Sequence, residues 1–158
     1  MFNSFKRSLP EISIFHLPTS APSTKALALL RSSLSGPYPP TNPKKPPLEF
    51  TLSVVEDVPT PDQLTTILSY LPSKTASPAS AFISAHWPDE RPDNVKGIAT
   101  LAKEHPGALR WPIVVDWADG QAAVGDVEGV KGILETLRKK RDGEAKEEEV
   151  YKPKGWFS

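Results

Sequence analysis

The sequence predicts an α/β protein built on one four-stranded mixed sheet that carries helices on both faces. Short alternating apolar segments, which are typical of strands, are separated by longer segments whose apolar residues recur at helical spacing. Their order over the 158 residues is β-α-β-α-(α)-β-β-α. A helix between the first two strands favours a parallel pair with a right-handed crossover. The Asp119-Gly120 pair between the last two strands is a hairpin signal.

The first strand and the first helix are expected to meet in a turn that is rich in hydroxyl residues. Apolar side chains alternate over residues 11–17, and Pro18 ends the strand. Leucines at helical spacing follow and predict an amphipathic helix. Either Ser20 or Ser23 can cap its first turn, because a hydroxyl accepts from the backbone N–H groups that have no partner there. Gly36 is expected to end this helix.

A second strand is expected at residues 48–55, and a well-defined helix start follows it. Thr60 fits the N-cap, Pro61 fits the first helical position, and Gln63 fits the reciprocal partner of a capping box. Apolar residues at helical spacing continue this second helix until Pro72, which closes it.

The rest of the chain is expected to add a loop, two helices and a hairpin. Residues 73–90 predict a loop with one helical turn, and residues 92–105 predict a helix. A β-branched strand at 113–117 precedes a tight turn and a short return strand at 121–124. The final helix, at 127–141, ends in four cationic residues, which favour the negative end of the helix dipole.

These elements predict a single domain at residues 11–141, with a short basic segment at 1–10 before it. Of the 18 prolines, many lie in residues 36–47, which are expected to form an exposed, polyproline-like connection. An alternative is that this stretch is a ligand for an SH3- or WW-type domain. Residues 142–158 carry charge runs with little apolar pattern, so a disordered charged tail is expected there.

Composition excludes several classes of function. The formal net charge is zero, so no field over the whole sequence favours nucleic acid as a partner. No apolar run approaches the roughly 20 residues that a membrane-spanning helix needs. The chain has no cysteine, which excludes a disulfide, a thiolate metal site and thiol catalysis. Three scattered histidines make a structural zinc site a poor fit, and we expect no metal and no cofactor.

Two segments, at residues 14–30 and 110–125, resemble the arsenate-reductase-like branch of the thioredoxin fold. In that branch a strand ends in His-Asn-Pro, a Cys-x-x-Ser turn opens an apolar helix, and a later Arg-Pro-Ile-Val-Val strand starts a hairpin. The resemblance implies a thioredoxin-like fold for the predicted sheet and helices. Here Ser20 stands at the thiol position, so the fold of a thiol enzyme is expected without its nucleophile.

A more specific likeness is to a family of fungal mitochondrial redox proteins in the thioredoxin-like superfamily. It covers residues 1–141 and rests on Met1-Phe2, Phe15-His16, Ser20 to Thr24, Pro59 to Leu64, and Arg110 to Gly120. The family motif has Arg and Pro adjacent, whereas this chain inserts Trp111 between them. The resemblance implies a mitochondrial location and a role in reducing small toxic molecules, and a small thiol compound or a protein as partner.

The same resemblance implies a binding cleft between the helix turn and the start of the third strand, with a cis proline at Pro112. The residues expected to line it are His16, Thr19, Ser20, Ser23, Arg110, Trp111 and Pro112. Ser20 has three possible roles: nucleophile, part of a retained anion- or peptide-binding turn, or simple helix cap, and capping chemistry favours the last. Asp116 and Asp119 are candidate acids, although turn chemistry alone explains Asp119.

Two functions remain open at this stage. The first is a mitochondrial redox protein of the thioredoxin-like superfamily that lacks thiol catalysis. The alternative is a non-catalytic interaction module with the same fold, which binds a protein partner or a small anionic ligand. In the second case Arg110 is the cation expected to meet the anion. The oligomeric state does not follow from the sequence.

Overall fold

The computed structural model describes residues 9–71 and 77–143. Most of the basic segment expected at 1–10, and residues 144–158 of the expected tail, therefore lie outside the described residues. Along the chain the elements are β1 (Glu11–Phe15), α1 (Ala21–Ser35), β2 (Thr51–Val55), α2 (Pro61–Tyr70), α3 (Pro78–Phe82), α4 (Val95–Glu104), the 3-10 helix η2 (Pro106–Ala108), β3 (Ile113–Asp116), β4 (Gln121–Val124) and α5 (Val127–Arg141). None of the helices in the described part of the chain is both long enough and apolar enough to cross a membrane.

The four strands form one mixed sheet in the order β2-β1-β3-β4. β1 pairs with β2 in parallel and with β3 in antiparallel, and β3 and β4 form the hairpin. The predicted mixed four-stranded sheet is confirmed. In the pairing of β1 with β3, Phe15 lies opposite Ile113. His16 follows Phe15 and Pro112 precedes Ile113, so His16 and Pro112 lie at the same end of the sheet.

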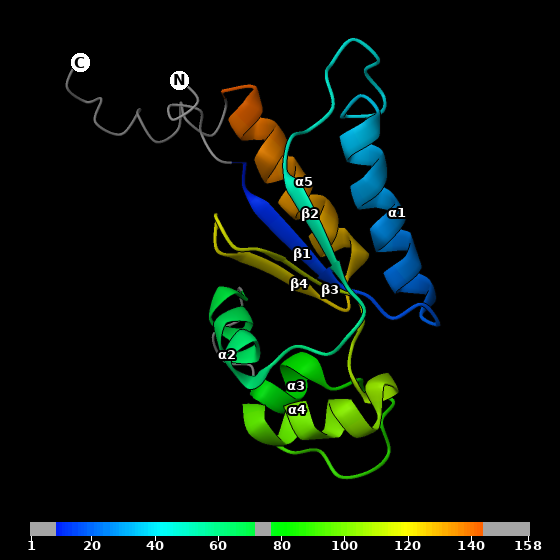
Figure 1. The fold of residues 1–158 in the computed structure, drawn as a ribbon, viewed down its shortest axis with the longest axis vertical. Coiled ribbons are helices and arrows are strands. Elements are labelled where there is room, and N and C mark those ends of the chain that lie inside the picture. Colours follow the sequence, from blue (N-terminus) through cyan, green and yellow to red (C-terminus); the bar gives the residue numbers. More distant parts are fainter. Residues whose placement is uncertain (1–8, 72–76, 144–158) are drawn as a thin grey trace, which may run out of the picture.

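Helices cover both faces of this sheet, as Figure 1 shows. Because successive strand residues point to opposite faces, Ile14 belongs to one core and Phe15 to the other. The core beneath α1 and α5 contains Ile12, Ile14, Ala26, Leu27, Leu30, Leu48, Phe50, Val114, Ala123, Val130, Ile133, Leu134 and Leu137. The core beneath α2, α3 and α4 contains Phe15, Leu64, Ile67, Phe82, Ile83, Ile98, Ala99, Ala102, Leu109, Trp111, Ile113 and Val115.

Side-chain caps set where the helices begin. The predicted capping box at α2 is present: the Gln63 N–H donates to Thr60 Oγ1 at 3.1 Å, and the Thr60 N–H donates to Gln63 Oε1 at 2.9 Å. At α4 the Gly97 N–H donates to Asn94 Oδ1 at 2.7 Å. This cap makes α4 begin at Val95, three residues after the predicted start. The single helical turn expected within residues 73–90 is α3.

The proline-rich loop is folded back on itself, so the expectation of an extended polyproline-like connection is wrong for its central part. The Tyr38 N–H donates to the Pro46 carbonyl at 3.2 Å, and the Asn42 N–H donates to the Pro39 carbonyl at 3.0 Å. A polyproline II helix has no internal hydrogen bonds. A linear ligand for an SH3- or WW-type domain is therefore not what this loop presents.

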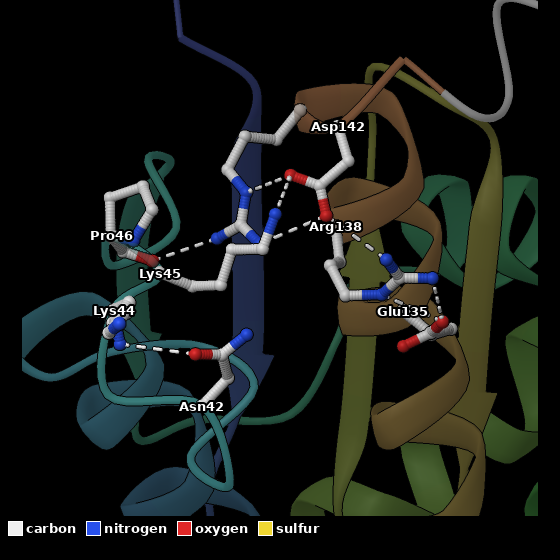
Figure 2. A network of polar contacts seen from close by, with 8 residues as sticks. Asn42, Lys44, Lys45, Pro46, Glu135, Arg138 and Asp142 are labelled. Atoms are coloured by element: carbon white, nitrogen blue, oxygen red, sulfur yellow. Dashed lines mark hydrogen bonds and ion pairs between the residues drawn. The ribbon is translucent and has the colours of Figure 1, made fainter.

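The loop is also joined to the end of α5 by the polar network in Figure 2. Arg141 Nη1 donates to the Pro46 carbonyl at 2.8 Å, and Lys45 Nζ lies 3.7 Å from Asp142 Oδ1. Arg138 Nη1 donates to the other oxygen of Asp142 at 3.0 Å. Hydrogen bonding by Arg141, together with the nearby positive charges, lowers the pKa of Asp142 from 3.8 to about 2. Asp142 is therefore the residue with which the cationic side chains of this network form ion pairs.

A candidate binding pocket beside the Ser20 turn

Ser20 caps α1. Its hydroxyl oxygen accepts the Ser23 backbone N–H at 3.3 Å, and its carbonyl accepts the Thr24 N–H at 3.0 Å. Ser20 has extended backbone angles, φ −96° and ψ 121°, which are usual for an N-cap residue. The side chain at the thiol position thus has a structural partner, in agreement with the capping role that the sequence favours.

His16 and Ser23 form a buried polar pair behind this turn. His16 is 7% exposed and Ser23 is 0% exposed. The Ser23 hydroxyl oxygen lies 2.7 Å from His16 Nδ1 and accepts the Leu17 backbone N–H at 3.0 Å. Ser23 therefore holds both the imidazole of His16 and the backbone of the turn in place.

His16 lines a pocket of about 340 Å³. Its other lining residues come from the turn after β1, the segment after β2, α4, η2 and the start of β3. They are Leu17, Pro18, Glu56, Asp57, Val58, Ala102, Lys103, Pro106 and Trp111. Most of this wall is apolar, whereas the side chains of Glu56, Asp57 and Lys103 are exposed at the mouth. The pocket is therefore mainly apolar, with three charged side chains where it opens to solvent.

Trp111 is held in place as a wall of the pocket. Its indole N–H donates to the Pro106 carbonyl at 2.7 Å, and the residue is 7% exposed. Because the polar group of the indole is already paired inside the protein, the ring offers only its apolar surface to the pocket. The Trp111-Pro112 peptide bond is cis, as the family resemblance implied.

Only part of the predicted cleft comes together in this pocket. His16 and Trp111 line it, whereas Thr19, Ser20, Ser23, Arg110 and Pro112 are absent from its wall. Arg110 Nε donates to the Ile83 carbonyl at 3.1 Å, and the Arg110 backbone N–H donates to the Phe82 carbonyl at 2.8 Å. The cation expected to meet an anionic ligand is therefore engaged with the backbone beside α3.

The charged residues at the mouth of the pocket were not among those predicted from the sequence. Glu56 and Asp57 follow β2, and Lys103 belongs to α4. The signal for the two acids was available, because residues after parallel strands meet at one edge of a sheet. Because β1 and β2 were expected to be parallel, the residues after β2 could have been predicted to lie beside His16. No pattern in the sequence indicated that Lys103 would lie at this pocket.

The candidate acids Asp116 and Asp119 lie at the other end of β3, in the hairpin turn. Asp116 is fully buried, and its Oδ1 accepts the backbone N–H groups of Ala118 and Asp119, each at 3.1 Å. Burial raises the pKa of Asp116. Asp119 pairs with Lys140 of α5. The described residues contain no group of three or more His, Cys, Asp and Glu side chains that could hold a metal ion.

Comparison with known proteins places the chain in a family. A family model described as a protein of unknown function, DUF1687, matches residues 2–125. This chain belongs to the DUF1687 family. The matched stretch includes every residue that lines the pocket and ends just before α5. No curated protein matches the chain.

Solved structures similar to this DUF1687 protein share its fold. An arsenate reductase from Vibrio cholerae is 19% identical, with a TM-score of 0.52; the similarity covers 82% of this chain and 98% of that one. A candidate arsenate reductase from Yersinia pestis is 22% identical, also with a TM-score of 0.52, over 78% of this chain and 98% of that one. At these identities the similarity shows the fold alone, and that fold is thioredoxin-like.

Proposed function

We propose that this DUF1687 protein is a mitochondrial redox-family protein that keeps the thioredoxin-like site for binding and performs no thiol chemistry with its own side chains. The observation that carries the proposal is Ser20, which caps α1 at the thiol position in a chain without cysteine. Thiol–disulfide exchange requires a thiolate. A serine hydroxyl needs a neighbouring base to act as a nucleophile, and no imidazole or carboxylate is hydrogen-bonded to the Ser20 hydroxyl in the described part of the chain.

The pocket supports a binding role. Its volume of about 340 Å³ lies within the usual range for small-molecule sites, and most of its lining residues are apolar. The ligand class that we propose is a small thiol compound, which brings the thiol group that the protein lacks. A simple anion is supported less, because Arg110 is engaged elsewhere and the mouth carries two carboxylates against one Lys.

The test is a turnover assay with glutathione and a small disulfide substrate. We expect the purified protein to match the uncatalysed rate, because no side chain can form a thiolate. Ser20→Cys restores a sulfur at the N-terminus of α1 and is expected to gain reactivity, whereas Ser20→Ala is not. Multiple turnovers by the unmodified chain would contradict the proposal.

The mitochondrial part of the proposal rests on the family resemblance and on the basic residues near the N-terminus. It is tested separately, by fractionation of cells that express the full chain with a tag after residue 158. We expect the protein to co-purify with mitochondria and to resist added protease until the membranes are opened. A protein found only in the cytosolic fraction would contradict this part and leave the biochemical part standing.

A further inference from the structure

The β3–β4 hairpin contains three buried oxygen atoms that accept no hydrogen bond from the residues that the structure describes. They are Asp116 Oδ2, Asp119 Oδ2 and Gln121 Oε1. Buried polar atoms are almost always paired in folded proteins, because an unpaired one loses its water and gains nothing in return. Ionised carboxyl groups and amide oxygens are acceptors only, so these three atoms lack a proton donor.

The three oxygens come from residues that lie together on one face of the sheet. Asp116 and Gln121 are directly opposite each other in the pairing of β3 with β4. Their side chains point to the same face as Val114 and Ala123, which belong to the core beneath α1 and α5. Opposite residues on one face have Cβ atoms about 5 Å apart. Asp119 follows in the turn, and its carboxyl group lies within hydrogen-bond range of the carboxyl group of Asp116.

The donors beside these oxygens are directed at other atoms. Asp116 Oδ1 accepts two backbone N–H groups of the turn, each at 3.1 Å. Lys140 of α5 pairs with Asp119 Oδ1. The amide nitrogen of Gln121 donates to Thr136 Oγ1 of α5 at 3.3 Å, which turns the amide oxygen away from that helix residue. The hairpin is therefore bound to α5 through Asp119 and Gln121, while the second oxygen of each carboxyl group has no donor.

A proton on one of the two carboxyl groups supplies the donor. Two carboxylates beside one ammonium group leave one negative charge in excess, and a single proton cancels it. Two carboxyl groups in contact do not both ionise readily, because their charges repel. A calcium or magnesium ion fits less well. Either ion needs more oxygen ligands than these three, and the covered atoms leave no access for water to supply the rest.

We propose that Asp116 and Asp119 share one proton, which Asp116 Oδ2 donates to Asp119 Oδ2, and that this proton holds the hairpin turn against α5. Asp116 is fully buried, whereas the side chain of Asp119 is 16% exposed. When the proton leaves to solvent, the two carboxylates repel each other, and Asp119 is the one that can move toward water. Its ion pair with Lys140 then no longer fixes the turn on α5. This inference is independent of the proposed function.

The groups around the pair set the direction of the pH dependence. Burial is the largest cause that raises the pKa of Asp116, and the negative charge of Asp119 and the contact between the two carboxyl groups act in the same direction. α5 brings the positive charge of Lys140, β1 begins with the exposed Glu11, and α2 places the ring of Tyr70 against the turn. A raised folded pKa means that the turn is held at low pH and released as pH rises through that pKa.

Carbon NMR of the full chain, labelled at its aspartate carboxyl groups, tests whether the proton is present. The Asp116 signal is identified by its loss in Asp116→Asn. We expect this carboxyl group to be protonated at pH 5, where an aspartate with the ordinary pKa of 3.8 is ionised. An Asp116 signal that is already that of a carboxylate at pH 5 would overturn the proposal.

Two variants at partly exposed positions test whether the proton is shared. Asp119→Asn removes the like charge and should move the titration of Asp116 to lower pH. Lys140→Gln removes a positive charge that favours the ionised pair and should move the titration to higher pH. The matched control, Lys139→Gln, neutralises the exposed neighbouring lysine and should leave the titration unchanged. If Asp119→Asn has no effect on the Asp116 signal, burial alone acts on Asp116 and the shared proton is refuted.

Amide hydrogen exchange tests the hold of the turn on α5. Protection of the Ala118 and Asp119 N–H groups, corrected for the intrinsic effect of pH on exchange, should fall by up to about tenfold for each pH unit above the ordinary pKa until the pair ionises. Protection should stay level in Asp116→Asn, which carries no titrating group. An equal fall in both proteins would refute the hold. If millimolar calcium or magnesium shifts the Asp116 signal, the oxygens form a cation site and the proposal is wrong.

Discussion

The Ser20 hydroxyl accepts the Ser23 backbone N–H at 3.3 Å, so the residue at the thiol position of this fold serves as the cap of α1. The first turn of α1 therefore directs a backbone N–H at the hydroxyl oxygen that stands where the similar fold has a thiol. Backbone N–H groups at a helix N-terminus favour negative charge, and a thiolate placed there benefits from them. The observed turn differs from a thiol-bearing one in a single atom, the oxygen of Ser20 in place of a cysteine sulfur.

Ser20→Cys should therefore give a thiol whose apparent pKa lies below the value of about 8.5 for a free cysteine. The physical cause is the set of N–H groups at the start of α1 that already serves Ser20. The rate of alkylation by iodoacetamide, measured against pH, reports this value. Thr19→Cys, one residue outside the cap and exposed, is the control and should titrate near the free value. Identical profiles would show that the turn does not stabilise an anion.

Thr60→Ala should lower the free energy of unfolding by about 1 kcal/mol, the usual effect of losing an N-cap side chain. Thr60 and Gln63 exchange two hydrogen bonds at the start of α2, and the alanine variant loses the bond that its side chain accepts. Urea unfolding followed by circular dichroism measures the change. Thr65→Ala, on the exposed face of the same helix, should change stability much less. Equal effects would argue against the cap.

Asp142 should make stability depend on acid pH. Its pKa is about 2 in the folded protein, chiefly because of the hydrogen bond from Arg141, and 3.8 is its ordinary value. A carboxyl whose folded pKa is lowered stabilises the fold above the ordinary value, and this contribution is lost as pH falls from about 4 toward 2. Asp142→Asn should flatten the stability curve in that window, whereas Asp89→Asn in an exposed loop should not. Parallel curves for the two variants would contradict this role.

Asp116 should make the stability of the protein depend on pH in the opposite direction. Burial raises its folded pKa above the ordinary 3.8, so its contribution to stability is fully present below that value and is lost as pH rises through the folded pKa. Asn at this position stays neutral and can still accept the N–H groups of Ala118 and Asp119. The stability of Asp116→Asn relative to the unmodified protein should therefore increase between pH 4 and pH 7. Urea midpoints at both pH values test this, and an unchanged difference would refute it.

Local signals were sufficient for most of the fold. The Thr60 capping box and the Asp119-Gly120 turn each lie within four residues of chain, so their partners are visible in the sequence itself. Strand alternation similarly placed Ile12 and Ile14 on one face of the sheet. These predictions are confirmed because the interactions that decide them are short in sequence.

The proline-rich loop and the pocket depended on distant partners, and there the sequence was a poorer guide. Pro46 accepts a hydrogen bond from Arg141, 95 residues away, and proline content alone gave no sign of this contact. Lys103 reaches the pocket only because α4 packs beneath the same sheet face as Trp111. Arg110 likewise has a distant partner, since its Nε donates to the carbonyl of Ile83.

The packing of α5 shows that the end of the family match and the end of the folded domain are not the same residue. The family match stops at residue 125, yet α5 begins at Val127 and covers one face of the sheet. Its buried side chains are Val130, Ile133, Leu134 and Leu137. A polypeptide cut at residue 125 would expose the leucines of α1 to water and invite aggregation. The stretch that the family model matches is thus shorter than the folded domain, and a fragment in which this core stays covered must include α5.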